Sequence, residues 1–357
     1  MGVCSISDDA RRKSFHVKIR SNLININNKY IFQKIFDNIT KLKTLKIIKY
    51  NKKIQKRLNI NIKDYKEYPE LYSPIEIEIK PADSEYDTFI NIPKEDELYY
   101  HIYFNINKEE EIKRNKIEKK DNVKIIKIII DNQVKSFSGL FEYCYIKYIN
   151  FKKFYRNNIF DMSYMFTRCY SLKEINLSNF NTNNVTNMEY LFFGCYSLKE
   201  LNLSNFNTNN VTDMNHMFYG CYSLKKINLS NFNTNNVIGM NHMFFGCSSL
   251  KELNLYNFNT NNVTNMRGMF FGCSSLKELN LSNFNTSKVT DMFIMFYECS
   301  SLKQINLHNF NIKNVTNIKS MFYGCSDKLI KNIKAQMKNI KSEAFLDYLE
   351  PDARLLL

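Results

Sequence analysis

The hydrophobic and polar positions of the chain repeat every 26 residues from about residue 144 to residue 325. In the unit that begins at Leu172, Ile175 and Leu177 alternate with polar residues, which predicts a short strand with one buried face. The Asn-Thr-Asn-Asn run at residues 181–184 predicts a turn, because asparagine tolerates left-handed backbone angles. Each unit is therefore expected to contribute one strand and a turn after it.

The apolar spacing changes after this turn. Apolar residues now recur three and four positions apart, which places them on one side of a short helix. They are Met188, Leu191, Phe192, Cys195 and Leu198. Gly194 fits a turn at the end of that helix. Arg168 and Glu298 take its place in other units, so we expect no obligatory positive φ there.

One cysteine column marks the units. Its members are Cys144, Cys169, Cys195, Cys221, Cys247, Cys273, Cys299 and Cys325. Cys144 belongs to it because residues 134–144 align with residues 185–195 without a gap, and this predicts eight strands, starting near residues 125, 146, 172, 198, 224, 250, 276 and 302. No C-x-x-C pair occurs, and cysteines beside Phe and Met behave as small apolar residues. We expect reduced, structural thiols and no metal site.

A repeat of this length, whose units bury apolar faces against one another, is typical of a solenoid. The units also resemble BspA-like leucine-rich repeats, because residues 134–326 match the pattern N-V-T-x-M-x-x-M-F-x-G-C-x-S-L-K-x-L-x-L-S-N-F about seven times. The resemblance implies a curved leucine-rich repeat array. For bacterial members it also implies a surface role in binding host or matrix proteins.

The expected fold is thus an α/β solenoid with one short strand and one short helix per repeat, preceded by a small α+β domain. We predict four regions: a flexible tail at 1–22, the α+β N-terminal domain at 23–120, the leucine-rich repeat solenoid at 121–326 and a C-terminal helical cap at 327–357. Apolar stripes within residues 29–58 indicate two helices, and strand-like stretches follow between residues 75 and 130. The lysine-rich terminal helix suits the open end of a solenoid.

Charge is concentrated at the N-terminus. The formal net charge is +15, and residues 1–63 hold 16 Lys and Arg against 3 Asp and Glu. This predicts attraction to an anionic membrane surface; the alternative is a solvated helical face. No nucleic-acid-binding module is recognisable, so nucleic acid is not an expected partner. The first twenty residues lack a secretory signal, which predicts a cytoplasmic protein.

Two resemblances concern the N-terminal region. The sequence Met-Gly-Val-Cys resembles a dual-acylation N-terminus, with Gly2 and Cys4 as the lipidation sites, and acylation would attach the protein to the inner face of a membrane. The alternative is an unmodified tail. Residues 30–39 distantly resemble the start of an F-box, which would imply a substrate adaptor of a ubiquitin ligase.

Catalytic chemistry is not indicated. The chain contains no recognised catalytic or nucleotide-binding motif, so we expect no enzyme, no catalytic residues, no metal and no cofactor. His216 and His242 recur 26 residues apart, and charged residues such as Glu189 and Arg267 lie in the corresponding segment of other units, which predicts that these side chains face solvent.

The outward positions of the strands are the predicted partner-binding site, on the concave face of the array. The candidate residues are Glu174, Asn176, Lys226, Asn228, Tyr256, Asn280 and His308. They predict a polar groove for a protein partner of unknown identity. The alternative is that the asparagine column only joins neighbouring strands. The predicted function is a non-enzymatic protein–protein interaction scaffold, with an F-box-like adaptor and a BspA-type surface adhesin as alternatives.

Overall fold

A computed structural model describes residues 26, 29–37, 44–45, 48, 51–61, 63, 72–82, 88–105, 110–118 and 120–349. The chain forms two compact units, Met1–Ser73 and Pro74–Leu357. Helices are few among the described residues, and short strands recur along the second unit, separated by turns and loops. The candidate lipidation sites Gly2 and Cys4 lie outside the described residues.

The first unit contains two described helices, α2 (Lys29–Asp37) and α4 (Lys52–Arg57). Its apolar cluster includes Phe32, Phe36, Ile48 and Ile54, all of which are buried. The side chain of Asn51 accepts a hydrogen bond from the Ile54 amide at 3.1 Å and so caps α4 at its N-terminus. The apolar stripes of the sequence therefore correctly indicated helices in this region.

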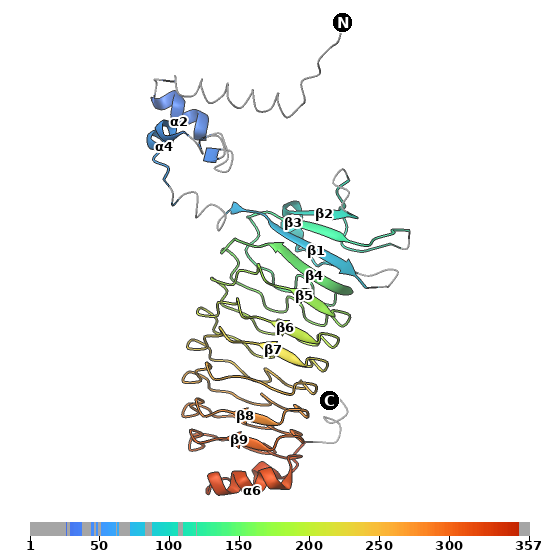
Figure 1. Ribbon diagram of the computed structural model, residues 1–357, viewed down its shortest axis with the longest axis vertical. Helices are drawn as coiled ribbons and strands as arrows, with labels where there is room; N and C mark the ends of the chain where they lie inside the picture. Colours follow the sequence, from blue (N-terminus) through green and yellow to red (C-terminus); the bar gives the residue numbers. More distant parts are fainter. Residues whose placement is uncertain are drawn as a thin grey trace. The chain divides into compact units, whose positions relative to one another are not determined.

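The second unit begins with a five-stranded sheet in the order β2-β3-β1-β4-β5 (Figure 1). Its strands are β1 (Ile75–Pro81), β2 (Tyr100–Phe104), β3 (Ile126–Ile130), β4 (Ile146–Lys153) and β5 (Glu174–Asn176). The pairs among β1 to β4 are antiparallel, whereas β4 and β5 are parallel. The division between the units lies at Ser73 and not at the predicted residue 120, because β1 and β2 pair directly with β3.

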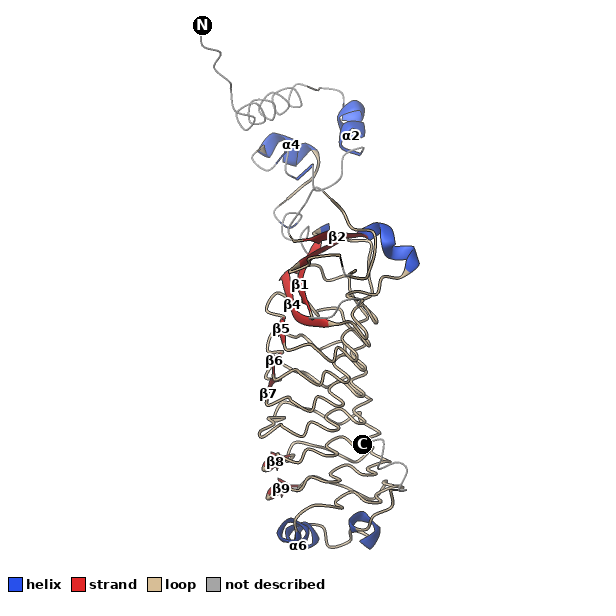
Figure 2. Cartoon of the chain, turned by 90° about the vertical axis from the view of Figure 1, so that its right-hand side faces the viewer, coloured by secondary structure: helices blue, strands red, loops and turns tan. Residues whose placement is uncertain are grey.

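Units of 26 residues then stack on this sheet in parallel register. Further strands are β6 (Glu200–Asn202), β7 (Lys226–Asn228), β8 (Glu278–Asn280) and β9 (Gln304–Asn306). Glu200 lies opposite Lys226 in β7, as Glu278 lies opposite Gln304 in β9. Figure 2 shows the strands on one side of the stack and loops on the other sides. The 26-residue period thus correctly predicted which residues lie beside one another.

The predicted helix of each repeat is wrong. The backbone amides of Tyr190, Phe192 and Gly194 donate to carbonyls of the next unit, at 3.0, 2.9 and 2.7 Å, and not to carbonyls four residues earlier. Left-handed angles at Tyr190 (φ 56°) and Gly194 (φ 68°) turn the chain so that alternate amides point along the stack. Successive turns place apolar side chains three and four residues apart just as a helix would, which explains the misleading spacing.

The same backbone geometry corrects the expectation about the glycine position. Arg168 and Glu298 replace the glycine and still adopt φ values of 56° and 58°. The stacked units therefore impose a positive φ there even on residues with a side chain.

The repeat core consists of buried columns, one per unit position. Cys195 is fully buried, and its thiol donates to the Phe166 carbonyl of the preceding unit at 3.2 Å. The eight described cysteines are all free and buried. Burial raises the pKa of the Cys195 thiol well above its ordinary value, so it stays protonated. The predicted packing role of the cysteines agrees with this geometry.

Polar side chains on the turns join successive units. The hydroxyl of the buried Thr208 donates to the Asn233 carbonyl and accepts from the Asn233 amide, both at 2.8 Å. The carboxamide of Asn205 donates to the Leu177 carbonyl of the preceding unit at 2.8 Å. Equivalent bonds recur along the stack, so these side chains satisfy the backbone as well as their own polar atoms.

The last described segments close the C-terminal end of the stack. They are α6 (Asp327–Gln336) and a 3-10 helix, η2 (Ser342–Phe345); another 3-10 helix, η1 (Lys94–Tyr99), precedes β2. Leu329 and Ile333 of α6 are buried against the last repeat, and Phe345 stacks on Phe322. These segments cover apolar side chains that no further repeat covers.

Candidate functional site on the strand face

The strand face consists of the outward side chains of β5 to β9 and of the matching residues 252–254. In β6, Glu200 and Asn202 are exposed on either side of the buried Leu201. This alternation follows from the pleat of a strand, in which successive side chains point to opposite faces. The face therefore presents one outward row for each unit position.

The predicted asparagine column lies on this face and is used within each unit. The side-chain oxygens of Asn176, Asn228 and Asn280 accept hydrogen bonds from amides two residues later, at 3.0, 3.1 and 3.1 Å. These bonds end each strand in a turn. The alternative interpretation was that this asparagine column joins neighbouring strands. Asn205 and its equivalents, which belong to a different column, form such bonds between units.

A central groove of about 660 Å³ contains two of the predicted residues, Lys226 and Asn228. It lies where residues 251–255 leave the strand ladder between β7 and β8. The Lys226 ammonium lies 3.5 Å from a Glu200 carboxylate oxygen, and both side chains are exposed. The groove is lined by Glu200, Leu201, Asn202, Lys225, Lys226, Ile227, Asn228, Lys251, Glu252 and Asn254. It can bind a polar or charged side chain above an apolar floor.

Two further hollows lie beside α6. One, of about 390 Å³, is lined by Asn280, and the other, of about 410 Å³, is lined by His308. Gln336 borders both hollows, and its side-chain nitrogen donates to the Ile305 carbonyl at 3.3 Å. The cap helix therefore forms one wall of the C-terminal part of the strand face.

The remaining predicted residues are exposed but lie outside these hollows. Glu174 and Asn176 lie on β5, before the central groove. Tyr256 is 68% exposed and follows Asn254, which lines the groove. The structure thus places all seven candidate residues on one face without gathering them into a single pocket.

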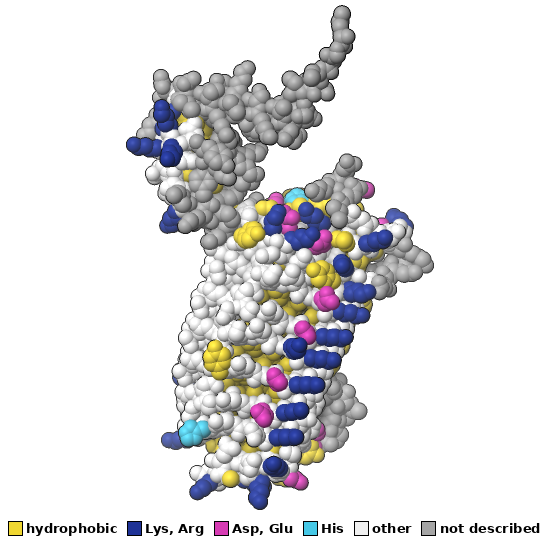
Figure 3. Space-filling view, in the orientation of Figure 1, with side chains coloured by type: hydrophobic (Ala, Val, Ile, Leu, Met, Phe, Trp, Pro, Cys, Tyr) yellow, Lys and Arg dark blue, Asp and Glu magenta, His cyan; other side chains and the backbone are white. Residues whose placement is uncertain are grey.

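A lysine column on the same face was missed by the sequence reasoning. Its members, one per unit and all exposed, are Lys173, Lys199, Lys225, Lys251, Lys277 and Lys303. Figure 3 shows a row of basic side chains running along the stack beside acidic ones. The signal was present in the sequence, because a lysine follows the Ser-Leu pair of each of these units.

The expectation that His216 and His242 face solvent is wrong. Their rings stack on each other at 4.8 Å between centroids, and Tyr190 stacks on His216 at 4.3 Å. Burial lowers the pKa of His216 to about 4 and that of His242 to about 3. Both rings are therefore neutral members of an aromatic column near pH 7. Glu189 and Arg267 misled the prediction, because they lie one position before the histidine column, whose other members include Tyr164 and Tyr190.

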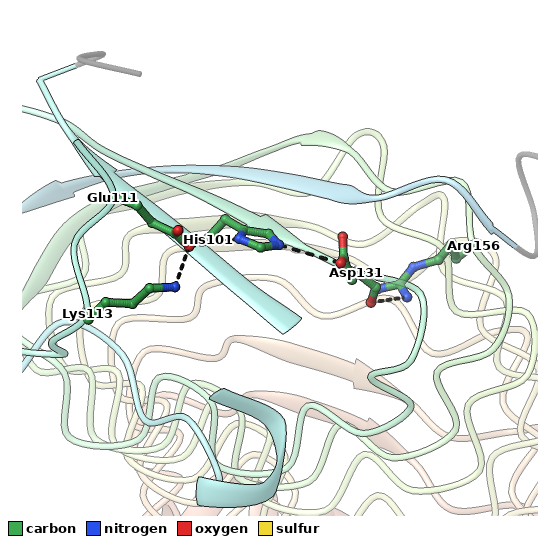
Figure 4. Close-up of polar contacts among 5 residues, drawn as sticks. All are labelled: His101, Glu111, Lys113, Asp131 and Arg156. Atoms are coloured by element: carbon green, nitrogen blue, oxygen red, sulfur yellow. Dashed lines mark hydrogen bonds and ion pairs between the residues drawn. The ribbon is translucent and has the colours of Figure 1, made fainter. Parts of the chain in front are cut away.

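A polar cluster near β2 was also missed (Figure 4). His101 lies between two carboxylates, with Nδ1 at 2.8 Å from Glu111 and Nε2 at 3.5 Å from Asp131. Lys113 pairs with Glu111 at 2.7 Å, and the fully buried Arg156 donates to the Asp131 carbonyl at 2.6 Å. These bonds fix an edge strand to the start of the repeats. These residue types do not recur at the same positions of the other units, so no periodicity signals them.

Among the residues that the structure describes, no group of three or more His, Cys, Asp and Glu side chains is arranged to hold a metal ion. Within the same part of the chain, every helix is too short or too polar to cross a lipid bilayer.

Comparison with known proteins gives one similarity. A family model described as "Mycoplasma protein of unknown function, DUF285" matches residues 135–254 and again residues 240–344. The searches of curated proteins and of solved structures found no match. The family match covers the stacked repeats, including the whole strand face.

Proposed function

We propose that this chain, which belongs to the DUF285 family, is a non-enzymatic scaffold that binds a protein partner on its strand face. In this proposal the units are BspA-like leucine-rich repeats wound as a solenoid. The family match over residues 135–344 supports the repeat assignment, since this family is associated with BspA-like repeat proteins. The family description itself assigns no activity.

The central groove is the observation that supports a binding role. The thiols, threonines and turn asparagines of the repeats bond to neighbouring units, whereas the side chains of Lys226 and Tyr256 are exposed. A groove with an apolar floor and polar walls suits a protein surface better than a small substrate, because it is open and is lined by residues of three neighbouring units. Exposed aromatic and charged side chains beside such a groove are typical anchors for a partner.

The proposal can be tested by photo-crosslinking in the native cell. A photo-crosslinking residue replaces Tyr256 in the full chain, and the control carries it in place of Lys313, which is exposed on a turn. We expect one protein to crosslink from position 256 and not from position 313. Equal crosslinking from both positions would contradict a specific strand-face site.

A binding measurement with the identified partner completes this test. The double variant Tyr256→Ala, His308→Ala should bind the purified partner about 10-fold more weakly, since truncating interface anchors typically costs 1 kcal/mol or more. An unchanged dissociation constant would exclude both side chains from the interface.

Localisation separates the scaffold from the adhesin alternative. We propose a cytoplasmic scaffold, but the BspA-like association also favours a surface adhesin. Antibodies against the repeats should label permeabilised cells and leave intact cells unlabelled. Labelling of intact cells would support the adhesin instead.

A further inference from the structure

The lysine column of the strand face is exposed to solvent. Among the described residues, none of Lys173, Lys199, Lys225, Lys251, Lys277 and Lys303 forms an ion pair. By contrast, Lys226, one position further along its strand, pairs with Glu200. Six like charges thus lie in a row beside exposed glutamates (Figure 3), and none of the six is held in an ion pair within the described part of the chain.

We propose that this column binds an acidic helix of a protein partner, lying along the stack with about one turn per repeat. This inference rests on the proposed scaffold function and specifies the chemistry of its partner. The occupant is a helix with acidic residues at every third or fourth position, so that one stripe of carboxylates faces the lysines.

The backbone sets the spacing of the column. The Lys225 amide donates to the Lys199 carbonyl at 2.8 Å, and the Lys303 amide donates to the Lys277 carbonyl at 2.8 Å. Adjacent hydrogen-bonded strands lie about 4.8 Å apart, so five intervals span about 24 Å. The charges therefore form a row whose pitch follows that of the stacked units, which parallel bridges also join across the break between β7 and β8.

This pitch distinguishes a helix from an extended chain. Five helical turns rise about 27 Å, which differs from the column by about 3 Å, within the reach of flexible lysine stems. Side chains on one face of an extended chain repeat about every 6.6 Å, so five intervals span about 33 Å. The extended chain therefore drifts out of register along the column, and the helix keeps its carboxylates near successive lysines.

The neighbouring side chains favour a polypeptide over nucleic acid or a membrane. Glu174, Glu200, Glu252 and Glu278 lie one position from the lysines and are exposed. Carboxylates there repel a uniformly negative phosphate backbone or an anionic lipid surface. A helix can place acidic residues on the lysines and basic or amide residues on the glutamates. Its apolar side chains can reach the floor of the central groove at Ile227.

The experiment uses the full chain and two labelled 18-residue peptides of identical composition. In one peptide glutamates recur at helical spacing, and in the other their order is scrambled so that no stripe forms. Fluorescence anisotropy at low salt measures both affinities. We expect the striped peptide to bind at least 5-fold more tightly than the scrambled one. Equal affinities would overturn the helical occupant.

Matched variants test the column itself. The triple variant Lys225→Gln, Lys251→Gln, Lys277→Gln removes three column charges, and the control variant Lys313→Gln, Lys328→Gln, Lys331→Gln removes three exposed charges elsewhere. The column variant should bind the striped peptide at least 10-fold more weakly, and the control variant should stay within 2-fold of wild type. A column variant within 2-fold of wild type overturns the inference. Equal unfolding temperatures of the two variants show that the fold is retained.

Further measurements test whether other anions bind the column, and they distinguish this inference from the scaffold proposal. An 18-nucleotide oligo-dT and vesicles containing phosphatidylserine should bind more weakly than the striped peptide. Tighter, column-dependent binding of either one overturns the acidic helix as occupant. Crosslinking at position 256 could identify a partner that binds the column variant as tightly as it binds wild type. In that case this inference fails and the scaffold proposal stands. If the striped peptide binds in a column-dependent way but crosslinking does not distinguish position 256 from position 313, the acidic-helix inference stands and the scaffold proposal fails.

Discussion

The buried columns and the strand face share one 26-residue period but differ in how their side chains are satisfied. In the interior, Cys195 and Thr208 bond to the backbone of a neighbouring unit. On the strand face, Tyr256 and the lysine column project away from the stack. The difference indicates that repetition alone does not identify a functional position. A column whose polar atoms form hydrogen bonds with neighbouring units holds the stack together. A column whose side chains project into solvent is available to another molecule.

The largest expected effect concerns the buried aromatic column. Phe192 is fully buried and stacks on Phe166 and Phe218, with centroids 5.2 and 5.9 Å away. Phe192→Ala should lower the free energy of unfolding by about 3 to 5 kcal/mol, because the cavity cannot close between two fixed neighbours.

Urea denaturation measures this loss, and Tyr256→Ala is the matched control. The control removes an aromatic side chain of similar size from the strand face and should change stability by less than about 0.5 kcal/mol. Similar losses for the two variants would contradict the distinction between the buried columns and the strand face.

The next effect is a pH dependence that arises from the histidine stack. The folded pKa values of His216 and His242 are lowered to about 4 and about 3. The unfolded chain therefore binds more protons than the folded chain below about pH 6.5, and stability falls with pH from there toward the folded pKa values. At pH 5 the loss should be about 2 kcal/mol per ring relative to pH 7.

Thermal unfolding between pH 7 and pH 5 tests this dependence. The double variant His216→Tyr, His242→Tyr should be markedly less sensitive, because Tyr164 and Tyr190 already occupy this column and do not titrate in that range. A variant as acid-sensitive as wild type would place the titrating groups elsewhere.

The smallest of these effects concerns one buried hydroxyl. Thr208→Val keeps the shape of the side chain but removes both hydrogen bonds to Asn233. The buried amide and carbonyl then lack a partner, which should cost about 1 to 3 kcal/mol. Chemical denaturation measures the cost, and Thr212→Val should cost less, because Thr212 is exposed and water can replace the 3.3 Å hydrogen bond that its hydroxyl donates to the Thr186 carbonyl. Equal costs would argue against the buried threonine column as a main link between units.

Much of the stack was predictable from the chain itself. The alignment of Cys144 with Cys195 predicts an eighth unit, and β4 begins at Ile146 as expected. The strands at Glu200 and Lys226 also lie in the predicted register. These features follow from periodicity, because a unit that stacks on its own copy places identical positions side by side.

The candidate site was only partly predictable. The seven outward residues do lie on one face, but their separation into a groove and two hollows depends on the break at residues 251–255 and on α6. Neither feature repeats, so neither is visible in the period. The lysine column does repeat, but its importance depends on the lack of ion pairs, which is a property of the packed side chains.

The sequence by itself determined the period, the buried columns and the outward rows of this protein. Only the tertiary structure decided where the backbone hydrogen bonds go. Side-chain spacing around Met188 suits a helix and a stack of turns equally well, and positive φ angles at Tyr190 and Arg168 select the turns. Those angles are maintained because the amides gain partners in neighbouring units, and a single unit contains no such partners.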